Sequence, residues 1–277
     1  MGEWMNGYLE KLAANRRENL EGGGKERIEI QHGLGKLTAR ERINLLSDPD
    51  SFKEIGSLVR ASSLTFEGTE RPSPSDGDVT GTARVNDRLI MIYASDFTVL
   101  GGSIGTQHGS KSIRALKMAA EWGVPMVNLL DSSGGRLGYT DVERAGLDWS
   151  FRIQSVNSGV VPQITVLMGS CIAGGAYLPT LCDFLLISRV SGTMWLGGPR
   201  QTQAATSEKI DRNIGGADYH MELSGSCDIV GNDDEETIKK MPRVVAVPAP
   251  EFQGKDTSMG ADRQSGPGSV RTHGYCS

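Results

Sequence analysis

The sequence predicts an α/β protein, in which helices pack on a β-sheet. Between about residues 76 and 247, short apolar segments rich in β-forming residues alternate with longer amphipathic segments. Such a repeating β-α order is typical of helices packed on sheets. The 277 residues also include 36 glycines, where an average chain of this length would contain roughly 20. We therefore expect tight turns and close backbone approaches between the elements.

The lead-in, residues 1–75, is predicted to be helical and to end in a connector. Apolar residues recur at near-helical spacing over 4–20, and the three glycines at 22–24 stop this pattern. Thr38 and Glu41 have the spacing of a capping box, which predicts a second helix ending before Asp48-Pro49. Residues 61–77 are rich in Ser, Pro, Gly and Asp and form the expected connector.

The main domain is predicted to cover residues 76–247. Segments 79–85 and 89–94 are β-rich and separated by Asn86-Asp87, a pair that favours a tight hairpin. The following elements are predicted in chain order: a strand at 124–131, a helix at 140–157 opened by Thr140 and Glu143, a strand at 163–168, a short helix at about 175–182 and a strand at 184–188.

The last predicted helix begins at a capping pair, Asn232 and Glu235, and ends at Met241-Pro242, because proline lacks the N–H group that a helix interior needs. Residues 248–277 contain almost no large aliphatic side chains. Such a segment cannot bury enough apolar surface to offset the loss of chain entropy, so we expect a disordered tail.

Composition and charge exclude several classes of protein. With 38% hydrophobic and 23% charged residues, the chain has no run near the roughly 18 apolar residues that span a membrane. A net charge of −5 without a basic stripe excludes a nucleic-acid-binding surface. The first 20 residues lack the apolar core of a secretory signal, which predicts a cytoplasmic protein. The cysteines (Cys171, Cys182, Cys227 and Cys276) form no CxxC pair, which predicts reduced thiols and no metal site.

Two glycine-rich turns each follow an apolar strand and precede a helix. They are 131–136, Asp-Ser-Ser-Gly-Gly-Arg, and 170–175, Ser-Cys-Ile-Ala-Gly-Gly. Backbone N–H groups at the start of a helix have no partner within it, so two converging turns would form an oxyanion hole for a thioester enolate. Taken alone, such a turn can also serve only to let a helix pack close to a sheet. The candidate catalytic donors are the N–H groups of Ala173, Gly174, Gly175, Gly134 and Gly135.

The segment 173–183, Ala-Gly-Gly-Ala-Tyr-Leu-Pro-Thr-Leu-Cys-Asp, resembles the signature of the crotonase superfamily, whose members bind acyl-CoA. Segments 79–85, 95–103 and 159–164 resemble the N-terminal half of the carboxyltransferase β subunit of biotin-dependent acyl-CoA carboxylases. The resemblance covers roughly residues 5–247. Two segments, 168–177 and 215–220, are more similar to the 3-methylcrotonyl-CoA branch of that family than to its propionyl-CoA branch.

This resemblance implies a crotonase-like ββα superhelix, with a single N-terminal carboxyltransferase domain that holds CoA behind a helical lead-in. It also implies biotin as a cofactor, carried on a biotin carrier or biotin carboxylase subunit, with coenzyme A as part of the substrate. The enolate of the acyl-CoA then attacks the carboxyl carbon. The protein supplies positioning and enolate stabilisation, and the cofactor supplies the reactive chemistry.

Candidate substrate-binding residues lie beside the turns. His108 and Lys111 are three residues apart on the helix expected after Gly101-Gly102, so both could face the CoA phosphates, or the lysine could simply be solvated. Arg136 is positioned for substrate by the first turn, and Tyr177 follows the second, where it can also be a packing residue. The full set is Gly101, Gly102, Lys111, Arg136 and Tyr177.

Two other enzyme classes with this fold fit the residues less well. A hydratase needs a carboxylic acid at the position of Tyr177, because addition of water to a double bond requires proton transfer. A serine peptidase needs a base within reach of Ser170, and sequence spacing places none of the histidines (His32, His108, His220 and His273) there. We expect His220 to be a structural hydrogen-bonding residue.

The resemblance further implies a C-terminal half, which in related β subunits completes the active site within an oligomer and holds the biotin ureido oxygen. Three alternatives follow for the 277 residues: a split enzyme whose other half is a separate chain, a truncated product, or a non-enzymatic subunit for acyl-CoA binding or assembly. A biotin-dependent acyl-CoA decarboxylase subunit is the enzymatic alternative, because it uses the same enolate chemistry in reverse.

Overall fold

The structure is a computed structural model that describes residues 3–61, 65–66, 69–70, 73–136, 147–208 and 210–247. The α-helices are α1 (Glu3–Glu21), α2 (Lys25–Gly33), α3 (Ala39–Leu46), α4 (Thr106–Trp122), α6 (Leu147–Asn157), α7 (Tyr177–Thr180), α8 (Pro199–Thr206), α9 (Ala217–Glu222) and α10 (Asp234–Val245). Short 3₁₀ helices are η1 (Ser75–Gly77), η2 (Leu100–Gly102), η3 (Ala173–Ala176) and η4 (Arg212–Gly215). The strands are β1 (Lys53–Ile55), β2 (Thr65–Phe66), β3 (Thr69–Glu70), β4 (Asp78–Val85), β5 (Arg88–Ser95), β6 (Met126–Ser132), β7 (Gln163–Ile172), β8 (Phe184–Ser188), β9 (Thr193–Trp195) and β10 (Ile229–Gly231).

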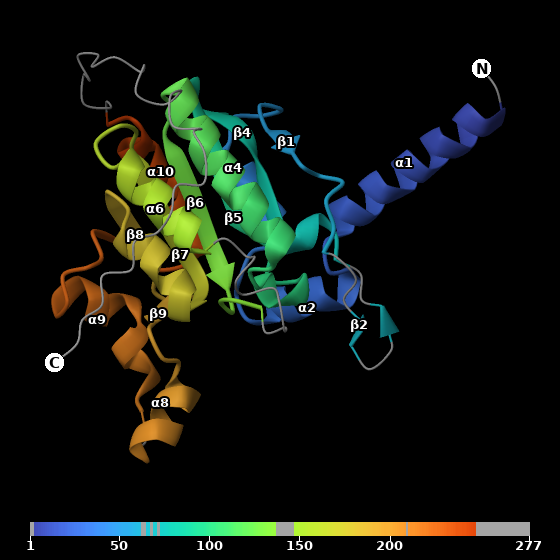
Figure 1. Cartoon of the computed structure of the whole chain (residues 1–277). Helices are drawn as coiled ribbons and strands as arrows, with labels where there is room; N and C mark the ends of the chain where they lie inside the picture. Colours follow the sequence, from blue (N-terminus) through green and yellow to red (C-terminus); the bar gives the residue numbers. More distant parts are fainter. Residues whose placement is uncertain are drawn as a thin grey trace, which may run out of the picture.

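A mixed sheet forms the centre of the molecule. Its strand order is β1-β4-β5-β6-β7-β8-β10, and β9 pairs with the end of β7. Strands β1, β4 and β5 are antiparallel, whereas β5, β6, β7, β8 and β10 run parallel to one another. Helices α4 and α6 cover one face and α3 and α10 the other, while α1 extends away from the sheet (Figure 1). The arrangement confirms the predicted α/β class.

Both faces of the sheet are buried, so side chains of each central strand enter two separate cores. In β5, Ile90 and Ile92 pack toward α3 and α10, and Met91 and Tyr93 pack toward α4 and α6. This alternation follows from the two-residue period of a strand. The parallel strands β6 and β7 end side by side, and an edge formed by the carboxyl ends of parallel strands is where α/β proteins place their sites.

The predicted hairpin is confirmed. Strands β4 and β5 are antiparallel along their whole length, and the two turn residues Asn86 and Asp87 have φ values of 50° and 65°. Positive φ at both central residues is the requirement of a type I′ turn, which matches the twist of the flanking strands.

The predicted capping box at the start of α3 is also confirmed. The Thr38 hydroxyl accepts a hydrogen bond from the Glu41 N–H (3.3 Å), and the Glu41 carboxylate accepts one from the Thr38 N–H (2.8 Å). Two backbone donors at the helix start are satisfied in this way.

Replacing Thr38 with alanine is expected to lower the free energy of unfolding by about 1 kcal/mol, because the Glu41 N–H loses its acceptor. Urea denaturation measures the change. The control is Thr206→Ala at an exposed position near the end of α8, where we expect a change within about 0.5 kcal/mol. Equal losses in the two variants would contradict a capping role.

Two predictions about the last helix are wrong. Helix α10 is capped by Asp233, which accepts from the Glu236 N–H (2.8 Å), one residue later than predicted. It also continues through Pro242 to Val245. A proline inside a helix costs about 3 kcal/mol, but the final turn buries Val244 and Val245 in the core. Burial of two valine side chains, at roughly 1.5–3 kcal/mol each, offsets that cost.

Two other predicted elements differ clearly in extent, and the helices α2, α8 and α9 were missed. Strand β7 continues to Ile172 because β9 pairs with its last three residues. The helix predicted at about 175–182 is η3 followed by α7, which together cover 173–180. Helix α6 is described from Leu147, and the proposed cap at Thr140 and Glu143 lies outside the described residues.

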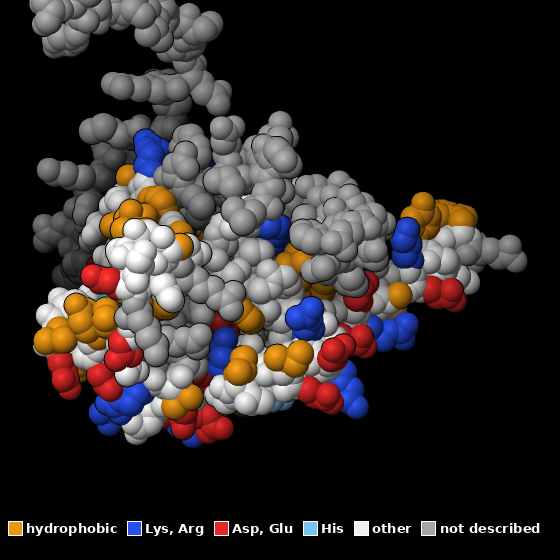
Figure 2. Space-filling model, turned by 90° about the horizontal axis from the view of Figure 1, so that it is seen from below, with side chains coloured by type: hydrophobic (Ala, Val, Ile, Leu, Met, Phe, Trp, Pro, Cys, Tyr) orange, Lys and Arg blue, Asp and Glu red, His pale blue; other side chains and the backbone are white. Residues whose placement is uncertain are grey.

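The boundaries of the predicted domains stay predictions. Part of the connector and all of the tail at 248–277 lie outside the described residues. Figure 2 shows that on the face seen from below, basic and acidic side chains are interspersed with small hydrophobic patches. Exposed hydrophobic residues in the C-terminal third of the described chain include Leu196, Ile214, Met221 and Leu223.

Candidate active site

The first glycine turn follows directly from β6. Gly134 has a φ of 90°, a conformation that favours glycine. Its N–H donates to the Ser132 hydroxyl (3.1 Å), so the prediction that this amide is an open donor is wrong. The next N–H, that of half-buried Gly135, has no acceptor in the described part of the chain. The first turn therefore offers the Gly135 amide, and Gly134 shapes the turn.

The glycines of η2 hold this first turn from the side. The Ser133 N–H donates to the carbonyl of Gly101 (3.0 Å), and the Ser132 hydroxyl donates to the carbonyl of Gly102 (2.7 Å). The Ile104 N–H adds a bond to the Gly134 carbonyl (2.9 Å). Gly101 and Gly102, which were predicted to contact substrate, thus contact the turn itself through their carbonyl oxygens.

The second glycine turn begins where the pairing of β7 ends. Ala173 is the first residue of η3, has a φ of 55° and is exposed, and Gly174 is half-buried. The first N–H groups of a helix have no partner within it. A Cβ atom added at Gly175 would lie 3.9 Å from the Cα of Gly134, so the two turns are in contact. The two turns therefore lie side by side, and the convergence of their N–H groups on one oxygen stays a prediction.

A cavity of about 260 Å³ opens beside the second turn. Its lining is mainly apolar and comes from η3, α7, β9 and α9: Ala173, Ala176, Tyr177, Thr180, Met194, Trp195, Leu196 and His220. Tyr177 is half exposed and its ring packs edge-to-face on Phe151, with 5.3 Å between the centroids. Apolar clefts with a few convergent polar groups are the usual form of a ligand site.

The imidazole of His220 is held by hydrogen bonds at the edge of this cavity. Its Nδ1 lies 3.1 Å from the hydroxyls of Ser224 and Ser226, and its Nε2 lies 3.3 Å from the Met194 carbonyl. Because a carbonyl can only accept, Nε2 carries the proton and Nδ1 accepts from a hydroxyl. This geometry confirms the structural hydrogen-bonding role predicted for His220.

Arg136 is buried behind the first turn. Its guanidinium donates to Asp76 (2.7 Å) and to the hydroxyl and carbonyl of Ser103 (3.0 and 2.8 Å). These contacts fix the end of the turn against η1 and η2. A contact between Arg136 and substrate stays a prediction, and the role visible in the structure is to hold the turn.

His108 and Lys111 share a face of α4, as their spacing predicts, but that face is buried, so the prediction that they face phosphates or solvent is wrong. The Lys111 ammonium lies 2.8 Å from the Asp78 carboxylate. Burial lowers the pKa of His108 to about 3, which keeps the ring neutral. Its Nδ1 donates to the Asp76 carbonyl (3.2 Å) and its Nε2 accepts from the Tyr93 hydroxyl (2.7 Å). The Asp78 carboxylate thus binds the Lys111 side chain, and the Asp76 carboxylate accepts a hydrogen bond from the His108 backbone N–H (2.8 Å).

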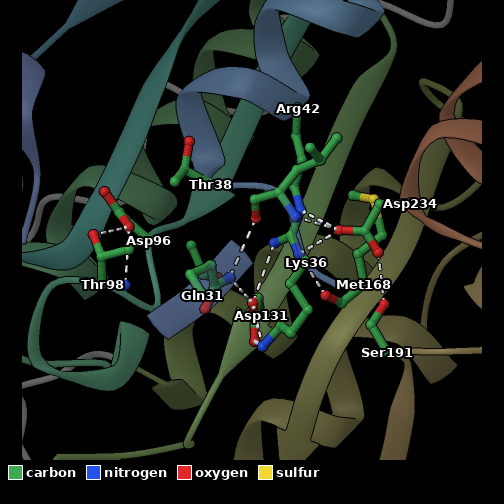
Figure 3. A network of polar contacts seen from close by, with 12 residues as sticks. Gln31, Lys36, Thr38, Arg42, Asp96, Thr98, Asp131, Met168, Ser191 and Asp234 are labelled. Atoms are coloured by element: carbon green, nitrogen blue, oxygen red, sulfur yellow. Dashed lines mark hydrogen bonds and ion pairs between the residues drawn. The ribbon is translucent and has the colours of Figure 1, made fainter. Parts of the chain in front are cut away.

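The sequence did not predict a buried network of charges beneath the two turns (Figure 3). Lys36 and Arg42 contact Asp131, and Arg42 also contacts Asp234. Each of these four residues is at most 8% exposed. One signal was present in the sequence: Arg42 is adjacent to Ile43 and four residues before Leu46, and an arginine buried with such apolar residues requires a buried partner.

The described residues contain no cluster of His, Cys, Asp and Glu suited to a metal ion. In the same part of the chain, Cys171, Cys182 and Cys227 form no disulfide bonds, and Cys276 lies outside it. Burial raises the pKa of Cys227 to about 11, so its thiol stays protonated. Among the described helices, none has the length and apolar character needed to cross a bilayer.

Known proteins share this sequence and fold. Residues 30–265 match the model of the carboxyl transferase domain. The propionyl-CoA carboxylase beta chain of Roseobacter denitrificans is 36% identical over 242 residues, which are 87% of this chain and 48% of that protein. The methylmalonyl-CoA decarboxylase subunit alpha of Propionigenium modestum is 34% identical over 90% of this chain and 50% of its own length.

A solved structure of transcarboxylase 12S, a hexamer described with methylmalonyl-coenzyme A bound, superimposes with a TM-score of 0.84. The two chains are 34% identical, and the match covers 90% of this chain and 49% of the other. The chain therefore spans about half the length of the curated relatives it matches. These likenesses confirm the crotonase-like carboxyltransferase fold, while the finer assignment to the 3-methylcrotonyl-CoA branch stays a prediction.

Proposed function

Because this chain belongs to the carboxyl transferase domain family, we propose that it binds an acyl-CoA and stabilises the enolate of its thioester during carboxyl transfer. The observation that carries this proposal is the contact between the two glycine turns beside an apolar cavity. A thioester carbonyl placed between the turns would meet main-chain donors from both, and its acyl group would enter the cavity.

The donors that we assign to the thioester oxygen are the N–H groups of Gly135, Ala173, Gly174 and Gly175, and Gly134 shapes the first turn. Negative charge grows on this oxygen when the enolate forms, and donors fixed in advance stabilise it without reorganising. The apolar cavity strengthens the interaction, because charge–dipole forces grow where water is excluded. Tyr177 and Trp195, which line the cavity, would contact the acyl group.

In this proposal, no side chain of the described residues acts as the base that removes a proton from the acyl-CoA. The imidazole of His220, which lines the cavity, has both nitrogens engaged in hydrogen bonds. Biotin, carried on a partner protein, would supply the carboxyl group. The ureido oxygen of biotin also needs hydrogen-bond donors. The two glycine turns in the described residues are already assigned to the thioester, so a second set of donors is required. We propose that a C-terminal half, on another chain or on a longer form of this one, provides that second set.

The assembly that we propose has three parts: this chain, a C-terminal carboxyltransferase half and a biotin carrier or biotin carboxylase subunit, combined in a cytoplasmic oligomer. Acyl-CoA carboxylation is the direction we favour. Decarboxylation is a second candidate, supported by the likeness to methylmalonyl-CoA decarboxylase subunits. The same enolate is formed in either direction, so the site described here serves both.

Calorimetric titration of the chain with acetyl-, propionyl- and 3-methylcrotonyl-CoA tests the proposal, with desulfo-CoA, which lacks a thioester, as the control ligand. We expect the thioesters to bind more tightly than the control, because only they offer a carbonyl to the turns. Carboxyl transfer is then assayed with a biotin carrier and a C-terminal half added. Binding without transfer under these conditions would support an acyl-CoA-binding subunit instead, and absence of thioester binding would refute the substrate.

A further inference from the structure

Strand β7 changes its neighbours just before it reaches the second glycine turn. Up to Leu167 it pairs with β8, and from Ser170 onward it pairs with β9. Its register with β6 also shifts at this point, because Leu130 pairs with Leu167 but Ser132 pairs with Cys171. Met168 and Gly169 therefore form an irregular step in the strand. A bulge of this kind bends the strand and redirects the residues that follow it.

The side chain of Arg42 reaches this step from α3 (Figure 3). One guanidinium nitrogen donates to the Met168 carbonyl (2.5 Å) and to Asp234 (2.7 Å), and another lies 3.3 Å from Asp131. Arg42 is only 1% exposed. It thus binds the backbone of β7 at the irregular step and the end of β6 at the same time.

Gly169 faces the carboxylate of Asp131 at the same place. A Cβ atom added at Gly169 would lie 1.8 Å from the Asp131 Oδ1, so only glycine leaves room for this carboxylate. Asp131 accepts further hydrogen bonds from Lys36 (2.8 Å) and Gln31 (2.9 Å). Two cations and two carboxylates balance each other, as a buried network requires.

Both glycine turns leave from this network. Asp131 is the first residue of the first turn, and Met168 lies five residues before Ala173. A displacement of either anchor moves the N–H groups that follow it, and donors act on an oxyanion only when placed to within a fraction of an ångström. The network is thus the structural element that sets the spacing between the donors of Gly135 and those of Ala173 and Gly174.

We propose, on the basis of the function proposed above, that Arg42 is a positioning residue for the oxyanion hole, acting through its contacts with Met168 and Asp131. It does not touch the substrate. It fixes the bulge of β7 and the end of β6 in one geometry, so that both turns direct their N–H groups at the same oxygen. Loss of Arg42 should weaken polarisation of the thioester carbonyl more than it weakens binding of the CoA ester.

Nuclear magnetic resonance of propionyl-CoA labelled with carbon-13 at the carbonyl measures this polarisation. In the wild-type protein we expect the bound resonance to move downfield. The test variant is Arg42→Met with Asp234→Asn, which leaves Asp131 paired with Lys36. In this variant, the downfield movement of the bound resonance should fall below half of the wild-type value. The Kd for propionyl-CoA should change by less than about threefold, because positioning affects the polarised state more than ground-state affinity.

The matched control removes a second ion pair made by α3, the pair between Arg40 and Glu54 of β1, through Arg40→Met and Glu54→Gln. This pair is also mostly buried but contacts neither strand end. We expect it to keep the wild-type resonance. Gly169→Ala displaces Asp131 and should therefore reproduce the effect of the test variant. It replaces the test variant in the experiment if the double variant does not fold. A wild-type resonance in folded test variants would overturn the role of Arg42 alone, whereas an unshifted resonance in the wild-type protein would overturn the proposed function and this role with it.

Discussion

Replacing Gly174 with proline is expected to lower carboxyl transfer by about 10²–10³-fold, which corresponds to loss of one oxyanion-hole donor. Proline removes the N–H of the second residue of η3. Because that N–H has no partner within the helix, its loss leaves the helical hydrogen bonds intact. The effect should therefore appear in the rate of the reaction and much less in the stability of the fold.

The measurement is the rate of transfer with the C-terminal half and biotin carrier present, with thermal unfolding as a check on folding. Gly174→Ala is the matched control, because it keeps the N–H and the φ of Gly174 is outside the left-handed region. We expect the alanine variant to retain activity within about tenfold. A folded proline variant with the activity of the alanine variant would show that the Gly174 amide does not serve the thioester.

The parts of the fold that the sequence predicted correctly depend on contacts between near neighbours. The capping box joins residues three positions apart, and the type I′ turn depends on two adjacent residues that tolerate positive φ. The two glycine turns were found in the same way, because each follows an apolar strand directly. Local spacing contains this information, so it can be read without knowledge of the tertiary structure.

The parts that were missed depend on long-range contacts. Arg42 meets Asp131 and Asp234 across 89 and 192 residues of sequence, and no spacing rule links such positions. The α2 helix was missed because only Gln31 of its side chains is buried, so it has no apolar face to detect. Its role is tertiary: it directs Gln31 to Asp131.

The pair His108 and Lys111 shows the limit most clearly. Helical spacing correctly placed both side chains on one face of α4, but it could not give the direction of that face. The direction is set by Asp76 and Asp78, which are fully buried and need nearby donors and positive charge. Burial of carboxylates is a property of the folded chain, so the inward orientation of Lys111 became visible only in the structure.

The second large effect is expected at Asp78, whose ionisation should make the protein less stable as pH rises. Burial raises the pKa of this carboxyl from its ordinary value of 3.8 to about 7, although Lys111 nearby opposes the change. The Lys111 ammonium lies 2.8 Å from one carboxyl oxygen, but this single cation does not offset the cost of complete burial, so the pKa stays raised. At pH values between these two pKa values, the folded state binds a proton that the unfolded state has released. The contribution of Asp78 to the free energy of unfolding is therefore fully present below about pH 4 and is lost as the pH rises toward 7.

The change from 3.8 to about 7 corresponds to about 4 kcal/mol of unfolding free energy. We expect this amount to appear as a difference between wild type and Asp78→Asn, measured by urea denaturation at pH 4 and pH 8. Taking the difference cancels groups common to both proteins, such as His108. Asp218→Asn is the control, since that carboxylate is exposed beside Arg189 and an exposed pair contributes little. If wild type and Asp78→Asn differ in free energy of unfolding by the same amount at both pH values, Asp78 is ionised throughout. Lys111 would then compensate the burial of Asp78 in full.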